Sequence, residues 1–279
     1  MKDNFQSVQT GWELNRRTHF DEIVANYDKI RPEYPRELFN DIFKYSNSTK
    51  GKNALEIGAG TGKATKPFLE AGYSVTAVEV GENMAEFLKE RYREYNNFNV
   101  ILSDFENASL EENCYDLIYA ASAFHWVNPE VGCPKTFRLL KNGGVVALFR
   151  YNAIPSIGEK VYEDIQTVYE KHYYSYYKSN KRPVKKSHAD FCTPAEILHS
   201  FGFKSLSEYG FSDISMTFYD ITRSFSADEF VAIRDTFSDH RGLPEDNRNA
   251  LYAELKEAIL KNGGRFDERY TFQLYMGRK

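Results

Sequence analysis

The stretch Leu55-Glu-Ile-Gly-Ala-Gly-Thr-Gly-Lys63 decides the fold of this 279-residue chain. A short apolar run, Asn53 to Ile57, leads into it, and a segment with helical spacing, Lys63 to Ala71, follows it. Glycines at alternating positions permit positive φ angles and let a ligand approach the backbone closely. We therefore predict a strand, a tight glycine turn and a helix, with a ligand held at the turn.

Short apolar segments alternate with helical ones through the first half of the chain. The predicted strands are 53–57, 74–78, 100–102, 116–120 and 145–149, and the predicted helices are 63–71, 83–95 and 129–140. We expect Asn142-Gly-Gly144 to end the last of these helices. Strands that are apolar throughout indicate a parallel sheet covered on both faces. Right-handed crossovers then make this a doubly wound, Rossmann-like α/β domain.

The pattern changes in the second half of the chain. Residues Ala153 to Phe201 are mostly polar with helical spacing, further helices are expected at 226–237 and 245–260, and strands at 215–222 and 269–277. Because no low-complexity linker separates the halves, we expect one sheet shared by both. Residues 1–150 are predicted to form an N-terminal cap segment and a ligand-binding core. Residues 151–279 are predicted to form a helical cap, the substrate region and the closing strands.

Composition excludes several classes of function. The net charge of −4 and the pI of about 5.9 give no general attraction for nucleic acid or an anionic membrane. The three cysteines are widely separated and form no zinc pattern, and the polar start resembles no secretory signal. We therefore expect a cytoplasmic protein without a membrane span and without a metal. The oligomeric state is left open.

Acidic residues mark the carboxyl ends of the predicted strands, where open α/β sheets bind their ligands. Glu56 lies in the first strand, Glu79 ends the second and Asp104 ends the third. Glu79 could accept hydrogen bonds from both ribose hydroxyls of a nucleoside, and Asp104 could accept one from the amine of adenine. Each acid could instead be a solvated strand end or a helix N-cap. Lys63 stands where a G-x-G-x-x-G dinucleotide pattern requires glycine, and no phosphate-binding GK[ST] sequence is present.

These segments resemble the ordered motifs of class I S-adenosylmethionine-dependent methyltransferases, in particular a small-molecule subgroup of the type 11 kind. The resembling segments are Glu56 to Gly62, Val78-Glu79-Val80 with Met84, Asp104-Phe105-Glu106, Tyr115 to Ile118 and Leu139 to Gly144. The resemblance covers about residues 19 to 150 and is loose over the closing strands. It implies a seven-stranded sheet with an antiparallel last strand, and S-adenosylmethionine as the cofactor.

The resemblance also implies the residues of a cofactor site. The glycine turn would contact the methionyl and ribose parts, Glu79 would bind the ribose hydroxyls, and Asp104 and Phe105 would frame the adenine. Phe105 could equally be a core residue. The complete set of implied cofactor contacts is Tyr27, Arg31, Glu56, Gly58, Ala59, Gly60, Gly62, Glu79, Asp104, Phe105 and Ala121.

Two further segments resemble that subgroup. Phe20 to Pro35 would fold over the cofactor, with Tyr27 and Arg31 capping it and Arg31 near the methionine carboxylate; a packing elbow is the alternative. Ser122 to Val127 follows the fourth strand, where the reactive methyl group would lie. His125 in this segment could touch the cofactor, orient the substrate or take a proton. It could instead be a structural histidine under Trp126.

The sequence thus predicts a methyltransferase that acts on a small-molecule acceptor by in-line methyl transfer. One alternative keeps the fold and methylates RNA or protein, supported only by the basic segment 178–186 beside the aromatic segment 173–177. A nicotinamide-dependent oxidoreductase is a second alternative, which conflicts with Lys63. A protein that binds the cofactor without methyl transfer is a third. We expect the aromatic segment and the N-terminal segment to close over the site, whose acceptor the sequence does not identify.

Overall fold

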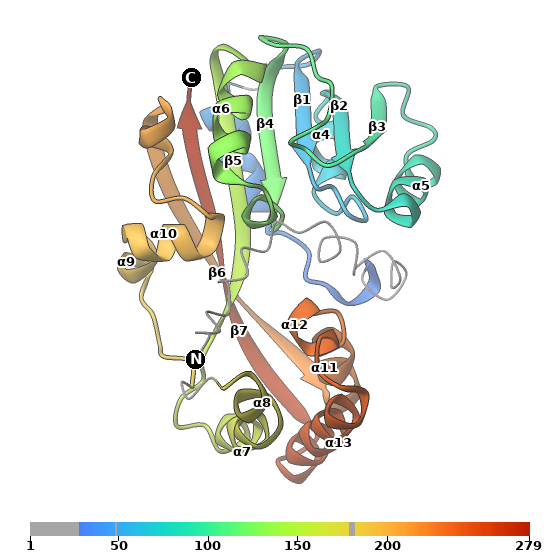
Figure 1. Ribbon diagram of the computed structural model, residues 1–279, viewed down its shortest axis with the longest axis vertical. Coiled ribbons are helices and arrows are strands. Elements are labelled where there is room, and N and C mark those ends of the chain that lie inside the picture. The colour runs from blue at the N-terminus through green and yellow to red at the C-terminus, as the bar shows by residue number, and fades with distance from the viewer. Residues whose placement is uncertain (1–27, 48, 179–181) are drawn as a thin grey trace, which may run out of the picture.

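The computed structural model describes residues 28–47, 49–178 and 182–279, and within them seven strands form one sheet. The strand order is β3-β2-β1-β4-β5-β7-β6 (Figure 1). The strands are β1 (Asn53–Ile57), β2 (Ser74–Glu79), β3 (Phe98–Leu102), β4 (Tyr115–Ala121), β5 (Leu140–Ile154), β6 (Ser212–Ser226) and β7 (Arg265–Arg278). Strands β3, β2, β1, β4 and β5 run parallel to one another. Strand β7 is antiparallel to both of its neighbours, β5 and β6. The predicted doubly wound sheet with an antiparallel last strand is confirmed.

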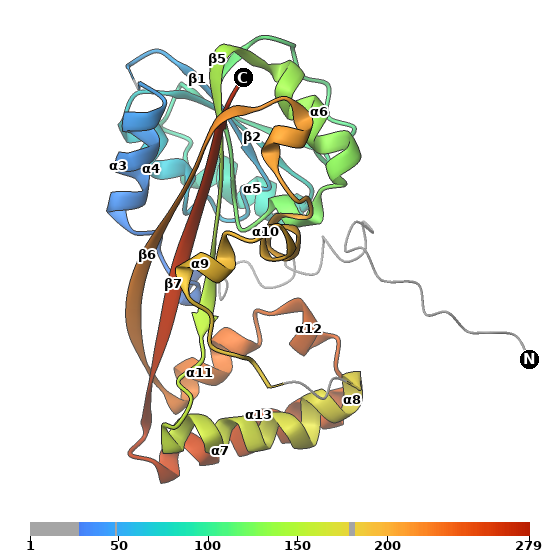
Figure 2. The same cartoon turned by 90° about the vertical axis from the view of Figure 1, so that its left-hand side faces the viewer.

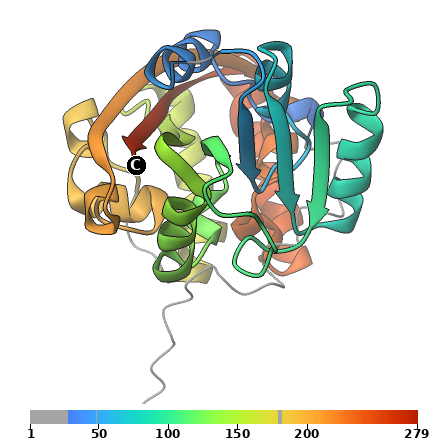
Figure 3. The same cartoon turned by 90° about the horizontal axis from the view of Figure 1, so that it is seen from above.

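Helices cover both faces of the sheet, as the view from above shows (Figure 3). They are α3 (Arg36–Tyr45), α4 (Thr65–Glu70), α5 (Glu82–Arg91), α6 (Pro129–Leu139), α7 (Lys160–Tyr169), α8 (Ser175–Tyr177), α9 (His188–Phe191), α10 (Pro194–Phe201), α11 (Ala227–Arg234), α12 (Ser238–Arg241) and α13 (Glu245–Lys261). Tighter or wider turns form η2 (Phe124–Trp126), η3 (Glu170–Tyr174) and η4 (Leu206–Tyr209). Buried residues of α3 and α4 pack in one hydrophobic cluster, and those of α6 and α10 pack in a second.

Strands β5, β6 and β7 each exceed their predicted lengths by five or more residues. Strand β5 runs to Ile154 instead of 149, because β7 pairs with it in an antiparallel ladder from Val145–Arg278 to Ile154–Arg269. Its apolar pattern ends at Phe149, because the following residues, Arg150 to Ala153, line a cavity. The prediction for Asn142-Gly-Gly144 was wrong. Helix α6 ends at Leu139, and these residues lie inside β5.

The extended ends of β5, β6 and β7 hold a group of helices away from the parallel half of the sheet (Figures 1 and 2). We call α7, α8 and α11 to α13 the cap. Buried apolar residues of α7, α11 and α13 share one hydrophobic cluster with the lower part of the sheet. Arg234 of α11 and Glu268 of β7 form a buried ion pair in the cap. Residue 150 lies inside β5, so the predicted division at this position falls within a strand.

No helix in the ranges 28–47, 49–178 and 182–279 combines the length and the apolar character needed to cross a membrane. The same ranges contain no group of three histidine, cysteine or acidic residues placed to hold a metal ion.

Candidate active site

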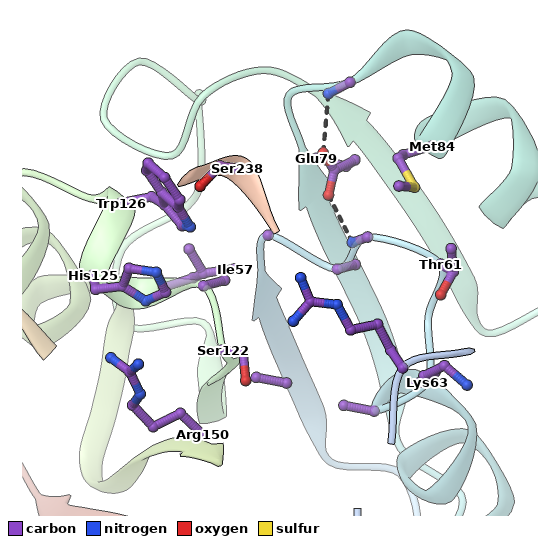
Figure 4. Close-up of a pocket in the computed structure, with 18 of the residues that line it drawn as sticks. Ile57, Thr61, Lys63, Glu79, Met84, Ser122, His125, Trp126, Arg150 and Ser238 are labelled. Atoms are coloured by element: carbon purple, nitrogen blue, oxygen red, sulfur yellow. Dashed lines mark hydrogen bonds between the residues drawn. The ribbon is translucent and has the colours of Figure 1, made fainter. Parts of the chain in front are cut away.

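A cavity of about 490 Å³ lies between the carboxyl ends of the parallel strands and the cap (Figure 4). Its walls come from the segment before α3, from the turns after β1, β2, β3 and β4, from the end of β5, and from α11, α12 and β7. Residues that contribute include Arg31, Tyr34, Gly58, Ala59, Gly60, Glu79, Asp104, Phe105, Ala121, Ser122, His125, Trp126, Arg150, Asn152, Arg234, Phe237, Ser238 and Tyr270. The size is typical of a pocket for a small molecule or cofactor.

The three glycines after β1 serve different purposes. All have positive φ angles, which side chains tolerate poorly. A Cβ atom on Gly58 would lie 2.7 Å from the Cβ of Ala123, so this glycine lets two turns approach each other. A Cβ on Gly62 would lie 2.6 Å from the Tyr92 ring. A Cβ on Gly60 would meet no atom within 4 Å, and Gly60 lines the cavity. Only Gly60 therefore combines the absence of a side chain with open space above it.

Glu79 fastens this turn to the end of β2. Its carboxylate accepts hydrogen bonds from the backbone nitrogens of Gly60 at 2.7 Å, Val80 at 2.9 Å and Gly81 at 3.0 Å. Figure 4 shows the side chain on the same side of the cavity as Met84. The backbone donors hold the carboxylate in one orientation at the cavity wall.

Asp104 and Phe105 occupy the turn after β3 and line the cavity, as does Ala121 at the end of β4. The Asp104 carboxylate accepts hydrogen bonds from the backbone and side-chain nitrogens of Asn107, at 2.8 and 3.0 Å. Phe105 is buried, and the Lys135 ammonium lies 5.2 Å from its ring centroid. Asp104 thus caps the turn that follows β3 and also lines the cavity. Phe105 is likewise both a buried core residue and part of the cavity wall.

Two predicted cofactor contacts do not line the cavity. Gly62 packs against α5, and Glu56 is fully buried inside β1. The Glu56 carboxyl accepts hydrogen bonds from the hydroxyls of Thr65 at 2.5 Å and Tyr119 at 3.0 Å. Burial raises its pKa to about 8, so this carboxyl is largely protonated at neutral pH. A third predicted contact, Tyr27, lies outside the described residues.

The segment before α3 joins the core to the cap. Arg31 lines the cavity and donates hydrogen bonds to the Tyr151 hydroxyl and to the carbonyl oxygen of Thr236, both at 2.6 Å. Its guanidinium lies 4.5 Å from the centroid of the Phe237 ring. Tyr34 donates a hydrogen bond to the Ser122 hydroxyl at 3.0 Å. The segment therefore touches both sides of the cavity, as the prediction that it folds over the site requires.

His125 lies in η2 and lines the cavity beside Trp126, whose ring centroid is 5.1 Å away (Figure 4). Burial lowers the pKa of the imidazole well below its usual value, and the nearby positive charges of Arg150, His199 and Arg31 lower it further. The imidazole is therefore neutral at physiological pH. Ser122, just before this turn, has a φ of 54°, an uncommon value for a residue other than glycine.

Sequence reasoning missed the part of the site that β5 and the cap contribute. Arg150 and Asn152 at the end of β5 line the cavity, together with Arg234, Phe237 and Ser238 from α11 and α12. One signal was present in the sequence, because Arg150 breaks the apolar run of the fifth strand at its carboxyl end. The contribution of α11 and α12 has no such signal, since it depends on how far the long strands carry the cap.

The aromatic segment 173–177 does not line the cavity, contrary to the expectation that it would close over the site. It supports α12 from outside. The Tyr173 hydroxyl donates to the Asp239 carboxylate and the Tyr177 hydroxyl donates to the Asp239 carbonyl oxygen, each at 2.5 Å. Two residues of the basic segment 178–186 pair with acids. Arg182 contacts Glu163 and Glu170, and Lys186 contacts Glu196.

Comparisons with known proteins agree on one class. Residues 55–148 match the family model of a methyltransferase domain. The chain is 25% identical over 243 residues to an uncharacterized methyltransferase of Schizosaccharomyces pombe, with 85% of each chain covered. Its fold is similar to that of a type II methyltransferase candidate from Anaeromyxobacter dehalogenans, with a TM-score of 0.62, 20% identity, and 89% of this chain and 97% of that chain covered. It is also similar to phosphoethanolamine N-methyltransferase 2 of Haemonchus contortus in complex with S-adenosyl-L-methionine, with a TM-score of 0.53, 17% identity, and 98% and 60% covered.

The chain is a class I S-adenosylmethionine-dependent methyltransferase, and S-adenosylmethionine is its cofactor. The structure fits this cofactor, because the open space above Gly60 and the fixed Glu79 carboxylate meet in one cavity. The nicotinamide-dependent oxidoreductase, considered from the sequence as an alternative, is set aside.

Proposed function

We propose that this methyltransferase acts on a small-molecule acceptor inside the cavity between the sheet and the cap. One observation carries the proposal. The cavity that contains the glycine turn and Glu79 is also lined by Phe237 and Ser238 from the cap. A small acceptor can be surrounded by these walls, whereas a nucleic acid or a protein would need an open groove. The aromatic residues Tyr34, Trp126, Tyr151, Phe237 and Tyr270 suit the apolar body of such an acceptor.

In this proposal the cofactor lies against the turn after β1. Gly58, Ala59 and Gly60 would contact its methionyl and ribose parts, and Glu79 would accept the ribose hydroxyls. Asp104 and Phe105 would frame the adenine, with Ala121 at the wall between the two ends of the cavity. When bound, the cofactor supplies a methyl group activated by its positively charged sulfur. The chain must then hold the acceptor in line with that methyl group and keep water out.

His125 lies at the opposite side of the cavity from Glu79 (Figure 4). A base is most effective when its pKa lies near the working pH, and the pKa of His125 is far below it. We therefore infer that His125 orients the acceptor by a hydrogen bond from its neutral ring and does not serve as the main proton acceptor. Arg31 bridges the cap and β5, so its proposed role is to hold the site closed as well as to face the methionine carboxylate.

The charges of the segment after α8 favour a small acceptor over RNA or an acidic protein. Arg182 and Lys186 each lie within 2.7 Å of a carboxylate, so part of the positive charge of this segment is already paired within the chain. We also propose that residues 1–150 supply the cofactor side of the site, together with His125 at the acceptor side, and that residues 151–279 supply the cap walls around the acceptor. Strand β5 is shared by both ranges.

Calorimetry tests the cofactor part of the proposal. S-adenosylmethionine and its demethylated product should bind in the micromolar range, roughly −8 kcal/mol, and NADH should not compete. Incubation with methyl-labelled cofactor and a cell extract tests the acceptor part. Label should enter molecules that pass an ultrafiltration membrane. Label retained in RNA or protein would refute a small-molecule acceptor.

A further inference from the structure

The end of β5 presents two polar side chains to the cavity, two positions apart. Arg150 and Asn152 both line it, and residues at i and i+2 of a strand project from the same face of the sheet. That face is the one covered by α10, because Arg150 Nη1 donates a hydrogen bond to the carbonyl oxygen of Ser200 at 2.7 Å. Figure 4 places Arg150 on the same side of the cavity as His125 and away from Glu79.

Both side chains keep buried donors for which the described residues provide no acceptor. Arg150 Nε and Asn152 Nδ2 are buried and make no hydrogen bond within the part of the chain that the structure describes. Buried donors are nearly always paired, because an unmade hydrogen bond inside a protein costs the desolvation of that group. Two such donors on one strand face therefore indicate an acceptor group that comes from outside the chain.

Unlike Lys63 and Arg234, two other cations of the cavity wall, Arg150 has no acidic partner in the described part of the chain. Lys63 pairs with Glu33, and Arg234 pairs with Glu268. No ion pair of Arg150 with a carboxylate occurs among the described residues, and its pKa is lowered by burial. Arg31 is a second guanidinium close enough to lower the pKa of neighbouring His125, whereas His125 and His199 have lowered pKa values and are largely neutral. Buried charges are normally paired, so this end of the cavity is suited to an anion.

We propose that the methyl acceptor carries a carboxylate group and that Arg150, assisted by Asn152, binds it. The proposal rests on the proposed function, since it names the chemical class of the acceptor for the same site. A guanidinium matches a carboxylate with two parallel hydrogen bonds, and an amide donor can complete the set. Because Arg31 donates to Tyr151 and Thr236, Arg150 is the guanidinium left to face the acceptor, and it balances the single charge of a carboxylate. A phosphate dianion would keep an excess negative charge in this partly buried site. The aromatic wall would contact the rest of the acceptor.

The carboxylate of the cofactor's own methionine is the rival occupant. Arg150 lies on the His125 side of the cavity, whereas the cofactor is expected along the turn that contains Gly60 and along Glu79 (Figure 4). The placement of Arg150 therefore favours the acceptor. If Arg150 binds the acceptor, its substitution should weaken binding of the acceptor carboxylate. If Arg150 binds the methionine carboxylate, its substitution should weaken binding of the cofactor.

Matched pairs of probes test the proposal. Acetate and acetamide, succinate and succinamide, and benzoate and benzamide have nearly the same shapes but differ in charge. Each is titrated calorimetrically into the full chain saturated with S-adenosylhomocysteine. At least one carboxylate should bind tenfold or more tightly than its amide, which corresponds to about 1.4 kcal/mol. If no carboxylate is preferred, the proposal is overturned.

Variants locate the effect. Arg150→Met should abolish the preference for the carboxylate and leave S-adenosylhomocysteine affinity within twofold, whereas Arg93→Met, at an exposed arginine, should change neither. Asn152→Asp should reverse the preference toward the amide, and circular dichroism checks that each variant folds. A loss of S-adenosylhomocysteine affinity in Arg150→Met would assign Arg150 to the cofactor and overturn the proposal. Failure of the unmodified chain to bind S-adenosylhomocysteine would instead count against the proposed cofactor site.

Discussion

Substitution of Gly60 by valine separates the ligand-binding role of the glycine turn from its structural role. Gly60 has a φ of 57°, and a Cβ atom there would meet no heavy atom within 4 Å. Folding should therefore tolerate the side chain, apart from the strain of a positive φ, which is about 1–2 kcal/mol for a residue with a Cβ. The two methyl groups would occupy the space that the cofactor needs.

Gly51→Val is the matched control. Gly51 also has a positive φ, 81°, and a Cβ there would also meet nothing within 4 Å, but the residue is exposed and does not line the cavity. Both variants should lose about the same 1–2 kcal/mol of unfolding free energy in a urea titration. Gly60→Val alone should weaken S-adenosylmethionine binding at least 100-fold in calorimetry, which is about 2.7 kcal/mol. Equal cofactor affinity in the two variants would refute the assignment of this turn to the cofactor.

Three other predictions concern Glu79, Glu56 and His125. Glu79→Gln should weaken S-adenosylmethionine binding by roughly 1.5–3 kcal/mol in calorimetry, the scale of hydrogen bonds lost to a charged group, whereas Glu86→Gln on the exposed face of α5 should leave it unchanged. The pKa of Glu56 is about 8 in the folded protein and 4.5 ordinarily, so its contribution to stability is complete below pH 4.5 and is lost as the pH rises through 8. In denaturant titrations from pH 5 to 9, the unfolding free energy of Glu56→Gln should therefore rise relative to that of the unmodified protein as the pH rises, by on the order of 3–5 kcal/mol at most. A difference in unfolding free energy that stays constant with pH would contradict the buried carboxyl. The NMR signal of the His125 ring, assigned by its loss in His125→Asn, should not titrate between pH 7.5 and 5.5, because the pKa of this imidazole is lowered well below its usual value; a midpoint near 6.5 would show that the ring is solvated.

The amino-acid sequence determined the parallel half of the molecule almost completely. The predicted and observed bounds of β1, β2 and β4 differ by at most one residue at either end. These strands are buried on both faces, so their apolar runs begin and end where the strands do. Glycines with positive φ and acids at strand ends are likewise local features, and they are sufficient to place Gly58, Gly60, Glu79 and Asp104 at the carboxyl edge of the sheet.

Local sequence was less informative where the contacts come from distant segments. Glu56 belongs to the same motif as Gly58, yet its side chain points into the core toward Thr65 and Tyr119. Successive side chains of a strand alternate between the two faces of the sheet, and this can be read from the sequence. Which face a given residue takes depends on how the helices pack against the sheet. From the sequence, Tyr173 and Tyr177 were expected to close over the site. In the structure, they lie outside the cavity and donate hydrogen bonds to Asp239 of α12.

Only the tertiary structure decided the acceptor side of the site. The pairing of β5 with β7 over ten residue pairs extends these strands past the parallel sheet, and this extension sets the distance between the cap and the glycine turn. Antiparallel pairing between segments more than a hundred residues apart leaves little trace in either segment, because backbone hydrogen bonds do not depend on side-chain identity. The same pairing places Arg150 and Asn152 in the wall of the cavity that His125, Arg234 and Ser238 also line. The sequence therefore defined the edge of the sheet where we propose that the cofactor binds, and the long-range strand pairing defined which side chains line the other end of the cavity.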